Sequence, residues 1–240
     1  MFFVFDVETI PDFDFIRTVL SPNEQEEISE EDLLITAGEQ ITNNRSGFLP
    51  PMYHRMVAWV GLWIENNGKP RQKIGWHGED EKEGLRQLFD ALQTFKDFGL
   101  IHHNGRGFDL PLLTYRALKH GMQMPLRLHH HDIRYRFSHV NVDLMDEFSN
   151  YGASSYPKLK HLGFLIDIPF KQTGEGNEVL TMYRDNRLEQ IEHYCYEDVI
   201  ATYIVWIHMK FTIGDITKEI FENLKERALN KLKEIQEREI

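Results

Sequence analysis

The amino-acid sequence predicts an α/β domain in which a mixed five-stranded sheet is flanked by helices. Apolar segments with strand character recur along the chain, and amphipathic segments with a period of three to four residues lie between and after them. A turn signal, Asn-Asn-Gly, joins two of the strands into a hairpin. The 240 residues, of which 41% are hydrophobic and 27% charged, are enough to bury a full core.

The first half of the chain predicts a strand, an insertion and a hairpin. Residues 2–8 are apolar at first and form a short strand, whereas residues 21–50 are polar, acidic and broken by Gly and Pro. We expect residues 21–50 to be an irregular insertion with a short helix. The hairpin joins strands at residues 56–64 and 71–77.

The rest of the chain supplies two further strands and most of the helices. The predicted strands are residues 99–103 and 139–145, and the predicted helices are residues 80–95, 109–121, 157–165, 187–210 and 215–240. Pro111 suits a first helical turn and Gly121 suits a helix end. We expect one domain over residues 1–214, with residues 215–240 packed on it as a C-terminal helix.

The net charge of −11 disfavours a nucleic-acid-binding protein when taken alone, because phosphate contacts need Lys and Arg. The distribution is uneven. Residues 24–32 carry six acids and no base, whereas residues 100–171 carry nine Lys or Arg against six acids, with eight of the twelve histidines. The middle of the chain is therefore locally basic, although uneven scatter explains this equally well.

The sequence shows no membrane or secretion signal. No apolar run approaches the ~18 residues of a membrane span, and the N-terminus lacks the basic region and cleavage site of a signal peptide. The single cysteine, Cys195, cannot form an internal disulfide. These features predict a cytoplasmic protein with no membrane partner.

Two carboxylates, Asp6 and Glu8, stand two residues apart at the end of the first strand. Residues i and i+2 of a strand face the same side, and like charges that close repel unless a cation lies between them. Ligand crevices of open α/β sheets lie beyond the carboxyl ends of strands. For this pair alone, simple solvation at a polar turn is an equally good explanation.

Asp198 lies in the middle of the apolar stripe of the predicted helix 187–210. A buried carboxylate is costly unless it is paired or bound to a metal, although a backbone group or an arginine could also satisfy it. Tyr194 lies one turn earlier, so its hydroxyl can share the same space. Asp109 follows a short strand and a Gly-rich loop. A role as a helix N-cap is an alternative explanation for an aspartate at this position.

Together these acids form a set of hard oxygen ligands without a Cys/His cluster. Such a set suits Mg²⁺ or Mn²⁺ rather than Zn²⁺. Two such ions about 4 Å apart suit phosphodiester hydrolysis.

Three motifs in order along the chain resemble those of the DEDD (DnaQ-like) 3′–5′ exonuclease superfamily. They are residues 5–9 (Phe-Asp-Val-Glu-Thr), 104–109 (Asn-Gly-Arg-Gly-Phe-Asp) and 194–198 (Tyr-Cys-Tyr-Glu-Asp). Over roughly residues 2–210 the chain most resembles free-standing predicted exonucleases related to the proofreading domain of family-B DNA polymerases. Each motif alone is weak, and their order and contexts make the set fairly specific.

The resemblance implies a ribonuclease-H-like fold and two bound Mg²⁺ or Mn²⁺ ions. Asp6 would bridge both ions, Glu8 and Asp198 would hold the one beside the nucleophile, and Asp109 would help to hold the second. Tyr194 would hydrogen-bond the attacking water. The resemblance also implies that Asn104 and Phe108 position the 3′-terminal nucleotide. We further expect Thr9 to bind substrate and Arg106 to be a candidate phosphate contact. The implied partners are 3′ ends of single-stranded DNA or RNA, and only the resemblance favours DNA.

The superfamily's other branch uses a histidine five residues before the last aspartate, and His193 has that spacing. On a helix, five residues turn about 140° away from Asp198 and four residues turn only about 40°. This geometry favours Tyr194, although a looser loop would still allow His193.

Other basic residues and other functions stay open at this point. Further candidate phosphate contacts, each explained more simply as a surface base, are Arg116, Lys158, Lys160 and Lys171. The insertion 21–50 could narrow the substrate cleft. The rival functions are an RNA-trimming exoribonuclease, a catalytically inactive nuclease-fold module that only binds nucleic acid or protein, and a phosphoesterase for small nucleotides.

Overall fold

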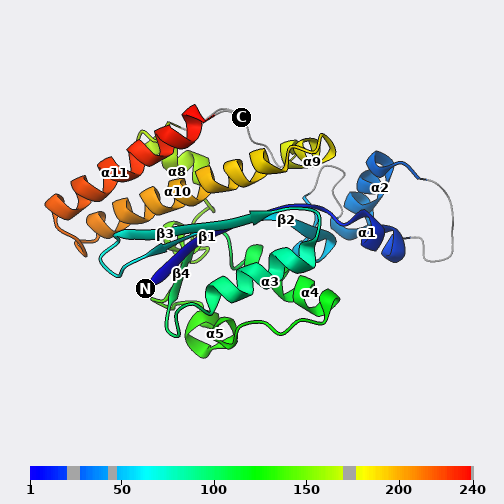
Figure 1. The fold of residues 1–240 in the computed structure, drawn as a ribbon, viewed down its shortest axis with the longest axis horizontal. Helices are drawn as coiled ribbons and strands as arrows, with labels where there is room; N and C mark the ends of the chain where they lie inside the picture. Colours follow the sequence, from blue (N-terminus) through cyan, green and yellow to red (C-terminus); the bar gives the residue numbers. More distant parts are fainter. Residues whose placement is uncertain (21–27, 43–47, 170–176, 239–240) are drawn as a thin grey trace.

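The sheet at the centre of the protein has five strands in the order β3-β2-β1-β4-β5. The computed structural model describes residues 1–20, 28–42, 48–169 and 177–238 (Figure 1). Strands β1–β2 and β2–β3 pair antiparallel, whereas β1–β4 and β4–β5 pair parallel, so the predicted mixed five-stranded α/β fold is confirmed. The strands are β1 (Phe2–Pro11), β2 (His54–Ile64), β3 (Pro70–His77), β4 (Gly99–His102) and β5 (Asn141–Asp143).

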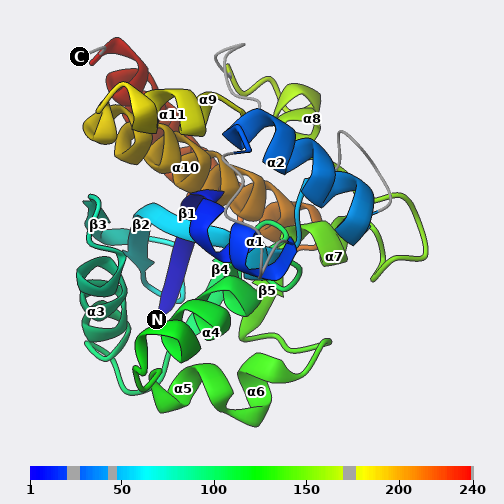
Figure 2. The same cartoon turned by 90° about the vertical axis from the view of Figure 1, so that its right-hand side faces the viewer.

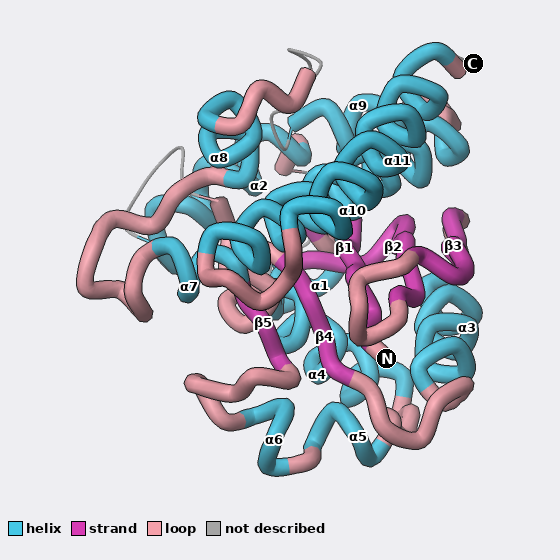
Figure 3. The backbone as a smooth tube through the Cα atoms, turned by 90° about the vertical axis from the view of Figure 1, so that its left-hand side faces the viewer, coloured by secondary structure: helices cyan, strands magenta, loops and turns pink. Residues whose placement is uncertain are grey.

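Helices cover both faces of the sheet (Figures 2 and 3). Those of the described residues are α1 (Phe13–Leu20), α2 (Glu30–Ala37), α3 (Glu81–Leu92), α4 (Asp109–His120), α5 (Leu126–His129), α6 (His131–Arg134), α7 (Leu144–Phe148), α8 (Leu159–Leu165), α9 (Asn177–Arg184), α10 (Leu188–Thr212) and α11 (Lys218–Glu237). Helix α10 crosses one face and α11 packs on α10, whereas α3 and α4 cover the opposite face. None of the described helices combines the length and apolar character needed to span a membrane.

Strand β1 lies in the middle of the sheet and sends alternate side chains to opposite faces. Phe3, Phe5 and Val7 pack with Trp59 of β2 into the core beneath α3 and α4. Val4 points the other way, into a second core built with α10 and α11. The even-numbered residues in this part of β1 therefore face α10, which positions the functional site described below.

Several element boundaries differ from the prediction. Strand β1 continues past Glu8 to Pro11, because β2 keeps pairing with it as far as His54 after a register shift. Strand β5 has only three residues, because the chain turns into α7 at Leu144. Helices α1 and α9 and the short helices α5 to α7 were not predicted.

The insertion 21–50 is more regular than predicted where the structure describes it. Helix α2 and a following π-helix (Gly38–Thr42) pack with α1 around a small core that includes Ile16, Leu33 and Tyr53. The parts of the predicted insertion at residues 21–27 and 43–47 lie outside the described residues.

A buried ion network joins α4 to the start of α1 and to α3. The guanidinium of Arg116, 3% exposed, lies 2.6 Å from both Asp12 and Glu81, and Lys119 and His120 complete the network. The prediction of Arg116 as a phosphate contact is therefore wrong, because its charge is buried and already paired. Its sequence context on an amphipathic helix gave no sign of these partners, which lie in distant segments.

Candidate functional site

Asp6 and Glu8 lie on the α10-facing side of β1, within the strand rather than at its end. Strand β1 pairs with β4 only as far as Val4 and beyond it continues beside β2 alone. The edge of β1 at Asp6 is therefore open toward the loop that follows β4. Glu8 is 9% exposed and Asp6 is half-buried, so both carboxyl groups are largely shielded from water.

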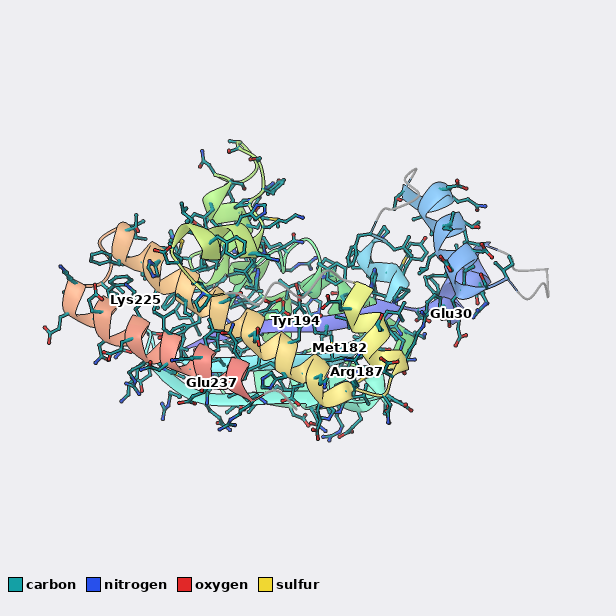
Figure 4. All side chains as sticks on the ribbon, turned by 90° about the horizontal axis from the view of Figure 1, so that it is seen from above. Glu30, Met182, Arg187, Tyr194, Lys225 and Glu237 are labelled. Carbon is teal, nitrogen blue, oxygen red and sulfur yellow. The ribbon has the colours of Figure 1, made fainter. Side chains whose placement is uncertain are left out.

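Helix α10 brings three side chains to this point of β1. Tyr194 lies on α10 where this helix passes over β1 (Figure 4), and it packs against the apolar cluster that contains Ile10 of β1. The thiol of Cys195 donates to the backbone carbonyl of Asp6 at 3.3 Å and lies 3.7 Å from a carboxylate oxygen of the same residue. Asp198 follows one turn after Tyr194 and interacts electrostatically with Asp6.

Asp109 approaches from the other side, as the first residue of α4. Its carboxyl group is buried, and the backbone N–H groups of Asp109 itself and of Val7, on the open edge of β1, act to lower its pKa. Its Oδ1 atom is buried and has no hydrogen-bond partner among the described residues. An unpartnered buried carboxylate oxygen is costly, and a cation is the ligand that would satisfy it.

All four carboxyl groups have raised pKa values, and burial is the largest cause for each. Burial, and then the charges of the neighbouring carboxylates, raise the pKa values of Asp6 and Glu8 well above their ordinary range. Burial also raises the pKa of Asp109 to about 6 and that of Asp198 to about 7. Near neutral pH a metal-free site therefore retains protons, and a divalent cation that displaces them would relieve the repulsion.

The donor set fits a hard divalent cation. One ligand atom each of Asp6, Glu8 and Cys195 lie within 4.8 Å of one another, and this is the potential metal-binding group among the described residues. Burial raises the pKa of the Cys195 thiol, so it stays protonated and serves as a hydrogen-bond donor rather than a thiolate ligand. The remaining donors are carboxylate oxygens, with Asp109 and Asp198 next to the group.

The structure brings Tyr194, and not His193, to the carboxylates. Burial and the charges of Asp198 and Glu8 raise the pKa of the Tyr194 hydroxyl, so the hydroxyl lies within their field. The Nε2 atom of His193 instead contacts the backbone carbonyl of Ile235 on α11. The two residues therefore face different neighbours, as the helical spacing predicts.

The loop after β4 is held by a residue that the sequence analysis missed, Asp143 at the end of β5. Its carboxylate accepts the backbone N–H of Asn104 at 2.7 Å and that of Arg106 at 3.0 Å, and it lies 3.5 Å from the ring of His102. Asn104 adopts a left-handed conformation with φ of 62°. A Cβ atom at Gly107 would approach the Asn104 Oδ1 within 2.5 Å, so a larger residue there would displace the Asn104 side chain.

A groove of about 520 Å³ opens at the carboxylates. Asp6 and Asp109 line it together with Phe108, Lys158 and residues from the end of the insertion, among them Phe48. The Phe48 side chain is 64% exposed and its ring centre lies 5.2 Å from that of Phe108. Two aromatic rings and one lysine ammonium group are thus available beside the carboxylates. No sequence pattern pointed to Phe48, which lies in a polar segment without periodicity.

Thr9 supports this wall of the groove. Its hydroxyl lies 3.1 Å from Nδ1 of His54, whose Nε2 lies 3.1 Å from the backbone carbonyl of Leu49. Burial lowers the pKa of His54 to about 4, so the ring is neutral at physiological pH and can bridge a hydroxyl and a carbonyl. Thr9 thereby connects β1 to the segment that carries Phe48.

Apart from Lys158, the other predicted phosphate contacts that the structure describes do not present a free charge to this groove. The Arg106 guanidinium donates to the Asn141 carbonyl at 2.6 Å and lies 3.4 Å from Asp146, so it is already engaged by protein groups. Lys160 does not line the groove, and Lys171 lies outside the described residues.

Comparisons with known proteins add the following findings. A family model described as "Predicted 3'-5' exonuclease related to the exonuclease domain of PolB" matches residues 46–240. No curated protein matches the chain. The fold is similar to part of the family B DNA polymerase from the hyperthermophilic archaeon Pyrobaculum calidifontis, with a TM-score of 0.55 and 15% identity. That likeness covers 87% of this chain but 24% of the polymerase, so the chain spans about a quarter of that protein's length.

Proposed function

The chain belongs to the predicted 3′–5′ exonucleases related to the exonuclease domain of PolB, as its sequence motifs led us to expect, and from this membership we propose a more specific activity. The enzyme removes nucleotides from the 3′ end of single-stranded nucleic acid, with DNA favoured, and releases 5′-mononucleotides. One observation carries this proposal. Carboxyl groups from β1, α4 and α10 converge beside one groove, although no ion pair with the described residues neutralises them.

Two Mg²⁺ or Mn²⁺ ions fit this cluster, because its donors are hard oxygens whose mutual repulsion favours cation binding. Such ions would lower the pKa of a water molecule and neutralise the charge that develops on a phosphodiester. Asp6, which interacts electrostatically with each of the other three carboxyl groups, would hold both ions. Glu8 and Asp198 would hold the one on the Tyr194 side, and Asp109 would offer its unpartnered Oδ1 to the other.

Tyr194 orients the attacking water in this proposal. Its raised pKa keeps the hydroxyl protonated at neutral pH, so it acts through a hydrogen bond and not as a general base. Packing against the cluster that contains Ile10, Val57 and Ile191 fixes the ring, which limits the directions in which the hydroxyl can point.

The groove residues position the 3′-terminal nucleotide. Asn104, held in its left-handed conformation by Asp143, presents its side chain at the groove. Phe108 and the exposed Phe48 offer faces on which a base can stack, and Lys158 supplies a positive charge for a phosphate. DNA is favoured because the fold is that of part of a DNA polymerase.

The test uses the purified protein with Mn²⁺ and a 5′-labelled single-stranded oligonucleotide of about 15 nucleotides. We expect a ladder of products that shortens from the 3′ end, with 5′-mononucleotides detected by chromatography. The Asp6→Asn variant should be inactive, and Asp185→Asn, which changes a carboxylate on the exposed loop before α10, should match the wild type. Absence of cleavage with every divalent metal would refute the proposal and favour an inactive binding module.

The same assay separates the rival activities. Matched DNA and RNA oligonucleotides compare a deoxyribonuclease with an RNA-trimming enzyme through their kcat/KM values. A phosphoesterase for small nucleotides would hydrolyse a dinucleotide as well as a longer strand, whereas the proposed exonuclease should prefer the longer strand.

A further inference from the structure

A second groove, of about 680 Å³, adjoins the one at the carboxylates. The two grooves share the lining residues Asn104, Gly107 and Met145. A nucleic-acid strand that leaves the first groove at the loop 104–107 would therefore enter the second. The second groove is lined by residues of α4, α5, α6, β5 and α7. Helices α4, α5 and α6 lie on the side of the sheet away from α10 (Figure 2).

The charged side chains of this groove suit an anionic ligand. Three arginines line it: Arg106, Arg134 and Arg136. The two acids in its lining are already engaged, because Asp143 is buried with backbone N–H donors and Asp146 lies 3.3–3.4 Å from two of these arginines. Arg134 is exposed, and its guanidinium has no hydrogen bond or ion pair with any residue that the structure describes. An exposed guanidinium without a protein partner is available to a phosphate.

Aromatic side chains lie beside these arginines. Tyr115 and Tyr156 line the groove and are 39% and 55% exposed. Next to it, Tyr135 and Phe137 are 50% and 51% exposed, with their ring centres 5.8 Å apart. Exposed aromatic faces that alternate with arginines provide stacking for bases and charge for phosphates, which is the chemistry of single-strand binding.

We propose that this second groove binds the single strand upstream of the 3′-terminal nucleotide. The inference rests on the proposed exonuclease function for its direction, since the 3′ end would lie at the carboxylates. Arg134 contacts a backbone phosphate, and Tyr156 stacks on a base one or more nucleotides from the end. Single-stranded nucleic acid is the occupant because a duplex would not present unstacked bases to these rings. The groove explains how an acidic protein can hold a polyanion, since the contacts come from its locally basic middle part.

The test measures binding and turnover separately. Fluorescence anisotropy with a labelled oligodeoxythymidine of about 15 nucleotides measures the Kd for binding. EDTA is present so that the oligonucleotide is not hydrolysed. Arg134→Glu and Tyr156→Ala should each weaken binding about tenfold. Arg134→Ala should also reduce the slope of log Kd against log salt by about 0.7, the value for one phosphate contact on a single strand. The matched control is Arg71→Glu, because Arg71 is an exposed arginine on β3 at the opposite edge of the sheet, and it should bind as the wild type does.

Turnover with Mn²⁺ then distinguishes this inference from the proposed function. With the oligonucleotide, Arg134→Glu should raise KM more than it lowers kcat. The loss in kcat/KM should be much smaller on the p-nitrophenyl ester of thymidine 5′-monophosphate, which reaches only the carboxylates. If the wild type cleaves but Arg134→Glu and Tyr156→Ala match Arg71→Glu in binding and KM, the groove is not the strand-binding site, although the exonuclease function stands. If the wild type binds the oligonucleotide through Arg134 and Tyr156 but cleaves nothing, the exonuclease function fails and the groove stands as a binding site.

Discussion

Replacing Asp198 by asparagine should stabilise the metal-free protein and weaken its response to metal. Burial raises the pKa of Asp198 to about 7 from an ordinary value of 3.8. The folded state therefore holds this proton more tightly than the unfolded state, so the carboxyl group's contribution to stability is complete below the unfolded pKa and is lost as pH rises through about 7. At about pH 8 the loss is roughly 2–4 kcal/mol, after allowing for the neighbouring carboxylates that share the effect. The Asp198→Asn variant avoids this loss, because its side-chain amide is neutral at every pH.

Thermal unfolding in EDTA measures this effect. For a chain of this size, we expect Asp198→Asn to raise Tm by about 5–10 °C at about pH 8, and by less than half of that at about pH 5. Added Mn²⁺ should raise the Tm of the wild type more than that of the variant, because the wild type has the additional ligand. The control Glu189→Gln, an exposed acid on the same helix, should change Tm little under either condition. A variant that is less stable than the wild type in EDTA at about pH 8 would refute the reasoning, because it would mean that Asp198 is satisfied by the protein itself.

The remaining predictions concern residues that line or support the carboxylate site, and the buried ion network around Arg116. Tyr194→Phe should lower kcat about 10- to 100-fold in the oligonucleotide assay, whereas His193→Ala should leave kcat within about threefold, and the opposite pattern would reverse their roles. Phe48→Ala should raise KM several-fold without changing Tm, since the ring is mostly exposed, and an unchanged KM would show that it does not touch substrate. Asp143→Asn should lower kcat at least tenfold, because two backbone N–H donors of the loop lose a charged acceptor, and wild-type kcat would contradict this. Arg116→Met should lower the free energy of unfolding by about 3 kcal/mol or more in urea titration, because two buried carboxylates lose their main partner, and a loss under about 1 kcal/mol would contradict the buried network.

Local patterns in the sequence predict most of the strands and the longer helices, and the relative positions of several site residues. The apolar run at residues 56–64 and the Asn-Asn-Gly turn predict β2 and β3 to within two residues, because both signals are local. The spacing of two in a strand brings Asp6 and Glu8 to one side, and the spacing of four in a helix sets Tyr194 beside Asp198 while His193 turns away. The placement of these residues in one site follows from these periodicities together with the order of the motifs.

Features that depend on contacts between distant segments could not be predicted in this way. Phe48 lies in a polar insertion with no periodicity, and it reaches the groove only because His54 and Thr9 hold that segment against β1. Asp143 acts through the backbone of a loop 37–39 residues away. Arg116 has the composition and spacing of a surface residue, and its burial depends on acids that approach it from α3 and from the end of β1. In each case, tertiary packing decides the role and leaves no local signature.

The most direct test of the central claim is anomalous X-ray diffraction at the manganese edge, from crystals soaked with Mn²⁺ and a 5′-mononucleotide. We expect two anomalous peaks enclosed by Asp6, Glu8, Asp109 and Asp198, with the phosphate of the nucleotide against them. The absence of any peak among these carboxylates, or peaks bound only at other sites, would contradict the assignment of this cluster as the metal centre.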